Sequence, residues 1–240
     1  IDDNNFYFAS EIKAIKKVLN INLDLDRESI SDYLSLMYIT GNKTIYKNIK
    51  KIPPGCTLKY DCLLSEKKIN KWNSFSFDSQ IKFSSINEIE EMLNLKIHNA
   101  IQKWQISDVP ISCSLSGGLD SSIITKIISK YKNNISTFSL GFEDSDIEDE
   151  LDSAKKISQL CGTNHQEIKI SLNHIIEELP KMIYSLDEPY GGGLPSWFIY
   201  KIASKNFKVI LTGTGADEIF GNYCKWFYLN KLNYTQLDKV

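Results

Sequence analysis

Residues 111–122 read ISCSLSGGLDSS, in which an apolar, strand-like start runs into two adjacent glycines and then into a helix-like segment. Strand-like and helix-like patterns go on alternating after this stretch. The expected strands lie at residues 111–115, 135–140, 165–170 and 208–212, and the expected helices at residues 121–131, 150–160, 172–186 and 196–205. This alternation predicts an α/β fold, in which helices cover both faces of a parallel sheet.

The loop after the first of these strands has the composition of an anion-binding site. Gly117 and Gly118 permit backbone angles that let successive N–H groups converge on an anion, and Ser116, Ser121 and Ser122 add hydroxyl groups. The helix that follows points the positive end of its dipole at the same place. The simpler alternative is a Gly-Gly turn whose polar side chains cap the helix.

Asp120 lies inside this loop, where its charge would repel phosphate unless a cation lay between them. Its presence therefore suggests bound Mg²⁺. The chain has no G-x-x-x-x-G-K-[ST] sequence, which argues against transfer of a γ-phosphate. Cleavage between the α and β phosphates of a nucleotide fits the loop better.

A second unusual loop, TGTGADE at residues 212–218, follows the last expected strand. Open α/β sheets place their ligands at loops that follow the carboxyl ends of strands. We therefore expect Asp217 to lie near Asp120, and two carboxylates with phosphate oxygens are a reasonable Mg²⁺ site. The alternative for Asp217 and Glu218 is the acidic first turn of an ordinary helix.

The beginning of the chain has a different pattern and predicts a separate domain. A Ser- and Phe-rich linker is expected at residues 73–85, and a capping box from Ser85 to Glu88 begins a long helix after it. The predicted domains are residues 1–80 and 81–240. Within the first domain we expect the end of a buried strand at residues 6–9, helices at 12–19 and 27–38, a turn at 53–55 and a strand at 57–60.

Composition excludes several classes of protein. The 240 residues carry a net charge of −2, which lacks the basic excess of a nucleic-acid binder. No apolar run is long enough to span a membrane and no signal peptide is evident, so we expect a cytoplasmic protein without a membrane partner. The five cysteines show no zinc or disulfide spacing. Arg27 is the only arginine, which leaves phosphate binding to lysines and backbone amides.

The SGGLDSS sequence resembles the signature loop of the ATP-pyrophosphatase superfamily, whose members form adenylates and release pyrophosphate. Within it, residues 107–111 and 215–223 resemble the glutamine-hydrolysing asparagine synthetase family, and residues 8–14 and 44–55 resemble the end of that family's glutaminase domain. The resemblance implies an adenine-nucleotide α-hydrolase-like, Rossmann-like domain. It also implies that an α+β remnant of an N-terminal nucleophile glutaminase domain precedes it.

The resemblance implies specific roles for the loop residues. The phosphates of ATP would lie on Ser116, Gly117, Gly118, Ser121 and Ser122, with Mg²⁺ between Asp120 and Asp217. The adenine and ribose positions of the family fall on Ser114, Leu140, Gly141, Thr212 and Gly213, for which ordinary packing at strand ends is the alternative. The catalytic positions fall on Asp120, Asp217 and Thr214.

The resemblance also implies the reaction and its partners. A carboxylate acceptor such as aspartate would be adenylated and then attacked by ammonia from glutamine, and a homodimer is compatible with the resemblance. Residues 187–190 resemble a family motif near the acceptor, although Gly191, Gly192 and Gly193 beside it are equally typical of a flexible loop.

The chain departs from the family pattern at Thr214, where the family usually has a glutamate. Threonine cannot act as a carboxylate base, which puts the acceptor in doubt and leaves a sugar acid or another carboxylate open. A β-lactam synthetase-like cyclase and a non-catalytic nucleotide-binding module also remain as alternatives. The family's glutaminase cysteine and its C-terminal helical part have no counterpart in these residues, so we expect an internal fragment.

Overall fold

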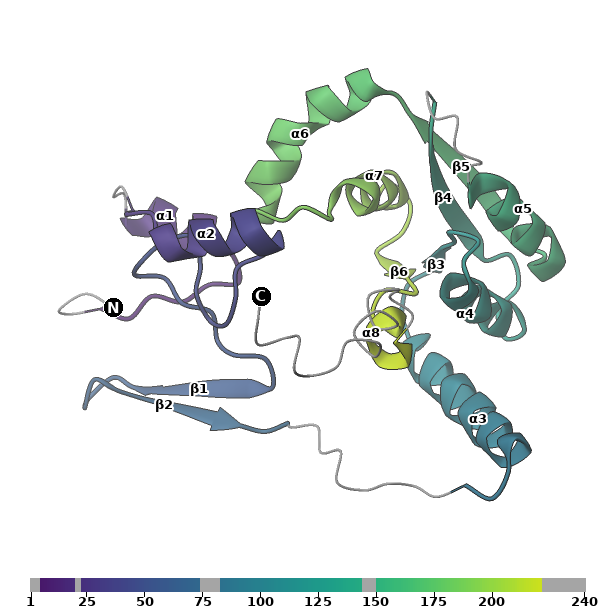
Figure 1. Ribbon diagram of the computed structural model, residues 1–240, viewed down its shortest axis with the longest axis horizontal. Helices are drawn as coiled ribbons and strands as arrows, with labels where there is room; N and C mark the ends of the chain where they lie inside the picture. The colour runs from purple at the N-terminus through teal and green to yellow at the C-terminus, as the bar shows by residue number, and fades with distance from the viewer. Residues whose placement is uncertain (1–4, 20–22, 74–82, 144–149, 222–240) are drawn as a thin grey trace, which may run out of the picture. The chain divides into compact units, whose positions relative to one another are not determined.

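The computed structural model describes residues 5–19, 23–73, 83–143 and 150–221 (Figure 1). The chain forms two compact units, of which the first contains Ile1–Ser84 and Asn173–Leu194, and the second contains Ser85–Leu172 and Pro195–Val240. Most of the expected linker, residues 74–82, lies outside the described residues. The predicted domain boundary between residues 80 and 81 therefore stays a prediction.

The first unit combines helices with a small antiparallel hairpin. Asp26 begins the second helix, because its carboxylate accepts the N–H of Glu28 at 3.0 Å, and Met37 ends it in the left-handed conformation. The hairpin pairs along its whole length, from Cys56 opposite Lys71 to Asp61 opposite Glu66. The elements are α1 (Ile12–Leu19), α2 (Arg27–Leu36), β1 (Cys56–Asp61), β2 (Glu66–Lys71) and α6 (Leu172–Leu186).

Two features of this unit differ from the sequence-based expectation. The segment around Phe6 and Phe8 forms no strand, because it pairs with no described strand; the Phe6 ring instead stacks on Tyr60 with 4.2 Å between the ring centroids. Phe8 is 82% exposed, so its neighbourhood is not a buried strand. Strand β2 was not predicted, because all six of its residues are exposed and its lysine-rich sequence has no apolar alternation.

The second unit is built on a four-stranded parallel sheet in the order β5-β4-β3-β6, which confirms the predicted α/β class. Figure 1 shows α4 and α5 on one side of this sheet and α7 on the other. The strands are β3 (Ile111–Ser114), β4 (Ser136–Phe142), β5 (Asn164–Ile170) and β6 (Val209–Leu211). The helices are α3 (Ile86–Trp104), α4 (Leu119–Ser129), α5 (Glu150–Cys161), α7 (Leu194–Ala203) and α8 (Ala216–Phe220).

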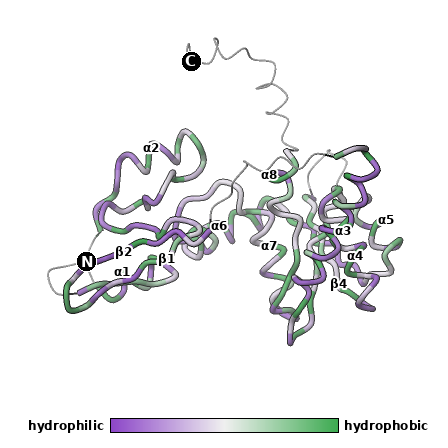
Figure 2. The backbone as a smooth tube through the Cα atoms, turned by 90° about the horizontal axis from the view of Figure 1, so that it is seen from below, coloured by the Kyte–Doolittle hydropathy of each residue, from purple (hydrophilic) through white to green (hydrophobic). Residues whose placement is uncertain are grey.

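A cluster of isoleucines anchors the helices α3 and α4 to the central strand of the sheet. Ile101 of α3 packs with Ile127 and Ile128 of α4 and with Cys113 of β3. In Figure 2 hydrophobic and hydrophilic residues are interleaved along α3 and α4, as expected for helices with one face in a core. Each buried isoleucine contributes roughly 1.5–3 kcal/mol relative to an exposed one. The β3 strand is therefore the fixed element on which the following loop is built.

The order of the strands places two loops next to each other. From β3 the chain moves to β4 and β5 on one side, and it then returns to add β6 on the other side of β3. Cys113 consequently pairs with Thr137 of β4 and with Leu211 of β6. The loops after β3 and β6 leave the sheet at this reversal of direction, where open α/β sheets form a crevice.

Among the described residues, no helix combines the length and the apolar character needed to cross a bilayer.

Candidate functional site

A cavity of about 310 Å³ lies where the loops after β3 and β6 meet. We call residues 116–122 the β3 loop and residues 212–218 the β6 loop. The cavity is lined by Ser114, Ser116, Gly118, Asp120, Ser121, Thr212, Gly213, Thr214, Gly215, Asp217 and Glu218. Two segments that are about ninety residues apart in the sequence thus form one polar site, as the sequence predicted from the strand ends.

Hydrogen bonds between serines fix the shape of the β3 loop. The Ser121 hydroxyl accepts the N–H of Ser116 at 3.2 Å, lies 3.0 Å from the Ser116 hydroxyl and donates to the carbonyl of Gly118 at 3.2 Å. The Ser122 hydroxyl donates to the same carbonyl at 2.7 Å. Ser121 is only 7% exposed, so its hydroxyl acts mainly as an internal brace of the loop.

The first turn of α4 opens toward the cavity without a side-chain cap. Gly118 is the N-cap residue and offers no side-chain acceptor, while its own N–H donates to the Ser116 hydroxyl at 3.3 Å. Amide groups at the start of a helix carry partial positive charge and bind anions readily. This end of α4 is therefore suited to a phosphate group.

Close packing at two glycines fixes the loops, one against α5 and the other against the start of α4. Gly117 has a φ of +82°, and a Cβ there would lie 2.7 Å from the backbone nitrogen of Ala154 in α5. A Cβ on Gly213 would lie 2.9 Å from the backbone nitrogen of Ser121 and 3.0 Å from the Cβ of Asp120. The β6 loop thus passes directly over the first turn of α4, and only a residue without a side chain fits there.

Three carboxylates line the cavity, of which two were predicted. Asp120 comes from α4 and Asp217 from the first turn of α8, and Glu218 follows Asp217. The described residues contain no group of three acidic, histidine or cysteine side chains that could hold a metal ion by themselves. A pair of carboxylates that is completed by phosphate oxygens and water matches the preference of Mg²⁺, so the donor set fits this ion only together with a phosphate ligand.

Four predicted residues do not line this cavity. Gly117 lies behind the loop against α5, and Ser122 lines a different cavity. Leu140 and Gly141 lie in β4, where Gly141 is buried. Gly215 and Glu218 line the cavity although the site prediction did not include them; their positions in the TGTGADE loop were the available signal.

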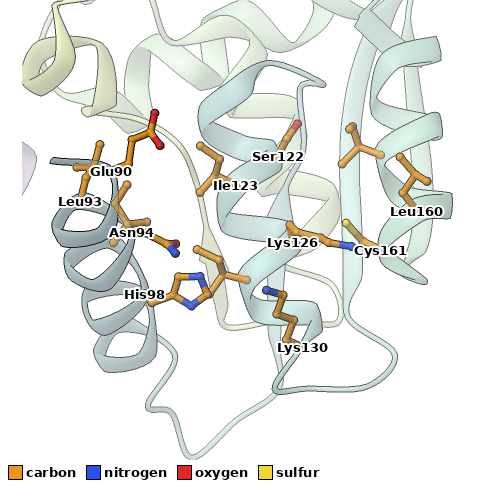
Figure 3. Close-up of a pocket in the computed structure, with 13 residues that line it drawn as sticks. Glu90, Leu93, Asn94, His98, Ser122, Ile123, Lys126, Lys130, Leu160 and Cys161 are labelled. Atoms are coloured by element: carbon orange, nitrogen blue, oxygen red, sulfur yellow. The ribbon is translucent and has the colours of Figure 1, made fainter. Parts of the chain in front are cut away.

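A larger cavity, of about 570 Å³, lies between α3, α4 and α5 (Figure 3). Its lining is mainly apolar and includes Leu93, Ile123 and Leu160, with the amino groups of Lys126 and Lys130 at its edge. None of the described residues lines both this cavity and the cavity between the loops. The described residues that line it include one carboxylate, Glu90, and no glycine, so this cavity does not match the predicted chemistry.

Buried and partly buried polar groups also lie in the sheet, outside the lining of the cavity. Burial raises the pKa of the Cys113 thiol to about 12, against the opposing effect of its hydrogen bond with Thr125. The His165 ring on β5 lies 2.9 Å from the Thr137 hydroxyl through Nδ1 and 3.2 Å from the Ser139 hydroxyl through Nε2. Burial lowers the pKa of His165, and nearby Lys155 adds to this effect while Glu167 opposes it.

Comparison with known protein families assigns both parts of the chain. Residues 92–239 match the family model described as asparagine synthase, and residues 1–72 match the glutamine amidotransferase domain. Asparagine synthetase [glutamine-hydrolyzing] 1 of Bacillus subtilis is 31% identical over 225 residues, which cover 92% of this chain and 34% of that protein. The putative asparagine synthetase [glutamine-hydrolyzing] 2 of Methanocaldococcus jannaschii is 31% identical over 246 residues, which cover 100% of this chain and 46% of that protein. The chain therefore spans a third to a half of the length of these relatives.

Solved structures with a related arrangement are more distant. The NH3-dependent NAD synthetase from Campylobacter jejuni aligns with a TM-score of 0.38 and 16% identity, over 54% of this chain and 58% of that chain. The glutamine-dependent NAD+ synthetase from Acinetobacter baumannii, in complex with adenosine diphosphate, aligns with a TM-score of 0.38 and 14% identity, over 70% of this chain and 31% of that chain.

Proposed function

Because the chain belongs to the asparagine synthase family, we propose that it binds ATP in the cavity between the β3 and β6 loops and activates a carboxylate as an adenylate. The carboxylate attacks the α-phosphorus of ATP and pyrophosphate leaves; ammonia then attacks the carbonyl carbon of the adenylate, so that an amide forms and AMP is released. One observation supports this most directly: Ser116, Gly118, Asp120 and Asp217 line one cavity at the crevice of a parallel sheet.

The loop geometry suits the binding of a triphosphate. The uncapped first turn of α4 attracts negative charge, and the serine braces keep the β3 loop in shape before the ligand arrives. Carboxylate attack on the α-phosphorus gathers negative charge on the phosphate oxygens, which fixed N–H donors stabilise without reorganising. The β3 loop would therefore provide much of the stabilisation of the transition state.

Asp120 and Asp217 are the proposed Mg²⁺ ligands, since both line the cavity at which the phosphates would lie. When bound, Mg²⁺ would neutralise charge on the phosphate oxygens. Glu218 lies in the same lining and would raise the negative charge of the cavity, which strengthens the need for a cation beside a triphosphate.

Glutamine is the proposed source of ammonia, and aspartate is the first acceptor to test. The match of residues 1–72 to a glutamine amidotransferase domain supports the nitrogen source. Thr214 lines the cavity and is exposed, at the position where the family usually has a glutamate. This difference favours a second candidate, in which the acceptor is a sugar acid or another carboxylate.

The decisive experiment measures pyrophosphate released by the full-length protein with ATP, Mg²⁺ and ammonium, with candidate carboxylates offered one at a time. We expect release to depend on one carboxylate, with an amide of that acid as the product. A product that is a ring closed on an internal amine would instead indicate a cyclase. Binding of ATP without pyrophosphate release for any carboxylate would contradict the catalytic proposal and leave a nucleotide-binding module.

A further inference from the structure

The cavity between α3, α4 and α5 takes no part in the proposed reaction, and it has the size of a ligand-binding site. Its volume of about 570 Å³ falls within the range of roughly 300–1,000 Å³ that is usual for small-molecule sites. Helices α3 and α5 each pack against α4, and Figure 3 shows α4 between the other two. All three helices belong to the second unit, so the cavity is formed within one compact part of the chain.

Apolar side chains from all three helices line the middle of this cavity. They are Leu93 and Ile97 from α3, Ile123 from α4, and Ile157 and Leu160 from α5. Leu93 is 42% exposed and Leu160 is 73% exposed. Single exposed apolar residues are common on protein surfaces, but apolar side chains that converge on one concave site are typical of ligand-binding grooves. The lining is therefore suited to the apolar body of a ligand.

Positive charge gathers at one end of the cavity. Lys126 and Lys130 are four residues apart on α4, which places their side chains about 5–6 Å apart on the same face of the helix. Neither amino group forms an ion pair or a hydrogen bond with any residue that the structure describes. A single carboxylate can lie between two ammonium groups at this spacing, where both can donate to it.

The other end of the cavity carries a negative charge. Figure 3 shows the amino groups of Lys126 and Lys130 toward the lower end, with the ring of His98, and Glu90 at the upper end. Glu90 precedes His98 by eight residues in α3, which corresponds to about 12 Å along the helix axis. The lysine end would attract an anionic group and the Glu90 end would repel it. The cavity thus favours a ligand with one anionic head and an elongated apolar body.

We propose that this cavity binds a single-chain fatty acid, with its carboxylate between Lys126 and Lys130 and its chain between α3 and α5. The elongated lining, which spans eight residues of both α3 and α4, matches an unbranched chain better than a bulky ring system. The simpler alternative is that the two lysines only complement the dipole at the end of α4. Other occupants of the apolar lining are a second copy of this chain and a lipid bilayer surface.

The test titrates the full-length protein calorimetrically with decanoate. Lys126→Glu and Lys130→Glu reverse the charge at the expected head position, and Lys126→Arg keeps it. Lys156→Glu is the matched control, because Lys156 is exposed on α5 and does not line the cavity. Leu160→Asp places a charge in the apolar part. Its control is Ile106→Asp, since Ile106 is 83% exposed in the same unit and lies outside the lining.

The two lysine reversals and Leu160→Asp should each weaken decanoate binding by about tenfold, the effect of losing one hydrogen bond to a charged group or an equivalent apolar contact. Lys126→Arg and both controls should bind like the wild type. Decanol, which has the chain without the charge, should bind about tenfold more weakly, and Lys126→Glu should not weaken it further. Butyrate should not bind detectably, because each methylene removed from water strengthens binding by about fourfold.

Alkylation of Cys161 by iodoacetamide provides a second readout at the cavity itself. Cys161 lines the cavity and is partly buried, so bound decanoate should slow its modification, as measured by peptide mass spectrometry. Cys62 is exposed between β1 and β2 and should react at the same rate with and without decanoate. Lys126→Glu should abolish the protection of Cys161 at decanoate concentrations that protect the wild type.

Several results would overturn the fatty-acid site. One is no binding of decanoate to the wild type, and another is equal affinity in all variants with no protection of Cys161. A wild-type dimer that Leu160→Asp dissociates and Ile106→Asp does not, measured by sedimentation, would show that a second copy covers this face. Co-sedimentation with phosphatidylglycerol vesicles without decanoate binding would assign the face to a bilayer surface.

Discussion

The two loops that line the cavity are built in opposite ways. In the β3 loop, the hydroxyls of Ser116 and Ser121 bind each other and the backbone, and the segment is anchored to a buried strand. The β6 loop has sparser bonds, such as the N–H of Thr214 to the Thr212 hydroxyl at 3.3 Å, and Thr214 is exposed. The comparison indicates that the first loop has a fixed shape, which would suit the proposed phosphate ligand, while the second contains Thr214, the residue at which the chain departs from the expected family pattern.

The largest effect is expected from Gly117→Ala, which tests the fixed shape of the β3 loop. The new Cβ would meet the Ala154 nitrogen at 2.7 Å, and the φ of +82° disfavours any side chain. Strain and overpacking together should lower the free energy of unfolding by about 2–4 kcal/mol, measured by urea denaturation. Gly162→Ala is the matched control, because Gly162 has a φ of +64° but nothing within 4 Å of an added Cβ. Equal losses in the two variants would show that packing of the loop against α5 is unimportant.

The next largest effect is expected at the two proposed Mg²⁺ ligands, one from each loop. Asp120→Asn and Asp217→Asn each remove one carboxylate from the cavity. Each should weaken Mg²⁺-dependent ATP binding by about tenfold or more, since charged ligands are lost from a phosphate-bound cation. Calorimetric titration with and without Mg²⁺ measures the effect. The metal assignment is wrong if ATP affinity and its Mg²⁺ dependence are unchanged in both variants.

A smaller effect on stability should distinguish Ser121, which braces the β3 loop, from its neighbour Ser122. Ser121→Ala removes the acceptor of the Ser116 N–H and leaves that group without its partner, which should cost roughly 1–2 kcal/mol of stability. Ser122→Ala loses a single bond, to the Gly118 carbonyl, and should cost about 0.5 kcal/mol. Thermal unfolding of both variants provides the measurement. The reverse order would contradict the role given to Ser121 as the internal brace.

The sequence was informative where local pattern decides structure. Alternating apolar segments predicted the parallel sheet, and the glycine and serine content of residues 116–122 predicted the loop that borders the cavity. Strand β2 was missed because exposed lysines obscure any alternation, and its pairing with β1 becomes visible only in three dimensions. The close approach of Gly213 to the Ser121 amide was also inaccessible, because it joins two strand ends that are distant in the sequence. Likewise, no local pattern in α6 indicates that it packs with the beginning of the chain.

The smallest effect concerns His165 in β5, which does not line the cavity. Burial lowers the pKa of His165, so the folded state binds a proton less readily than the unfolded state does. Stability should therefore be complete above the ordinary pKa of 6.5 and should fall as the pH drops below it. Urea midpoints at about pH 7.5 and pH 5.5 measure the decrease, which His165→Gln should reduce. An identical decrease in that variant would assign the pH dependence to other groups.

Because α6 forms one compact unit with the beginning of the chain, the choice of fragment boundaries matters for protein engineering. Met182 of α6 is 6% exposed, and Asp187 has its hydrogen-bond donor, the N–H of Lys13, in α1. A recombinant piece that is cut between the two family matches, after residue 72 and before residue 92, would separate Asp187 from this donor and α6 from the rest of its unit. An apolar surface and an unpaired carboxylate would then face solvent, and such a piece should aggregate more readily than one that carries residues 5–221 together.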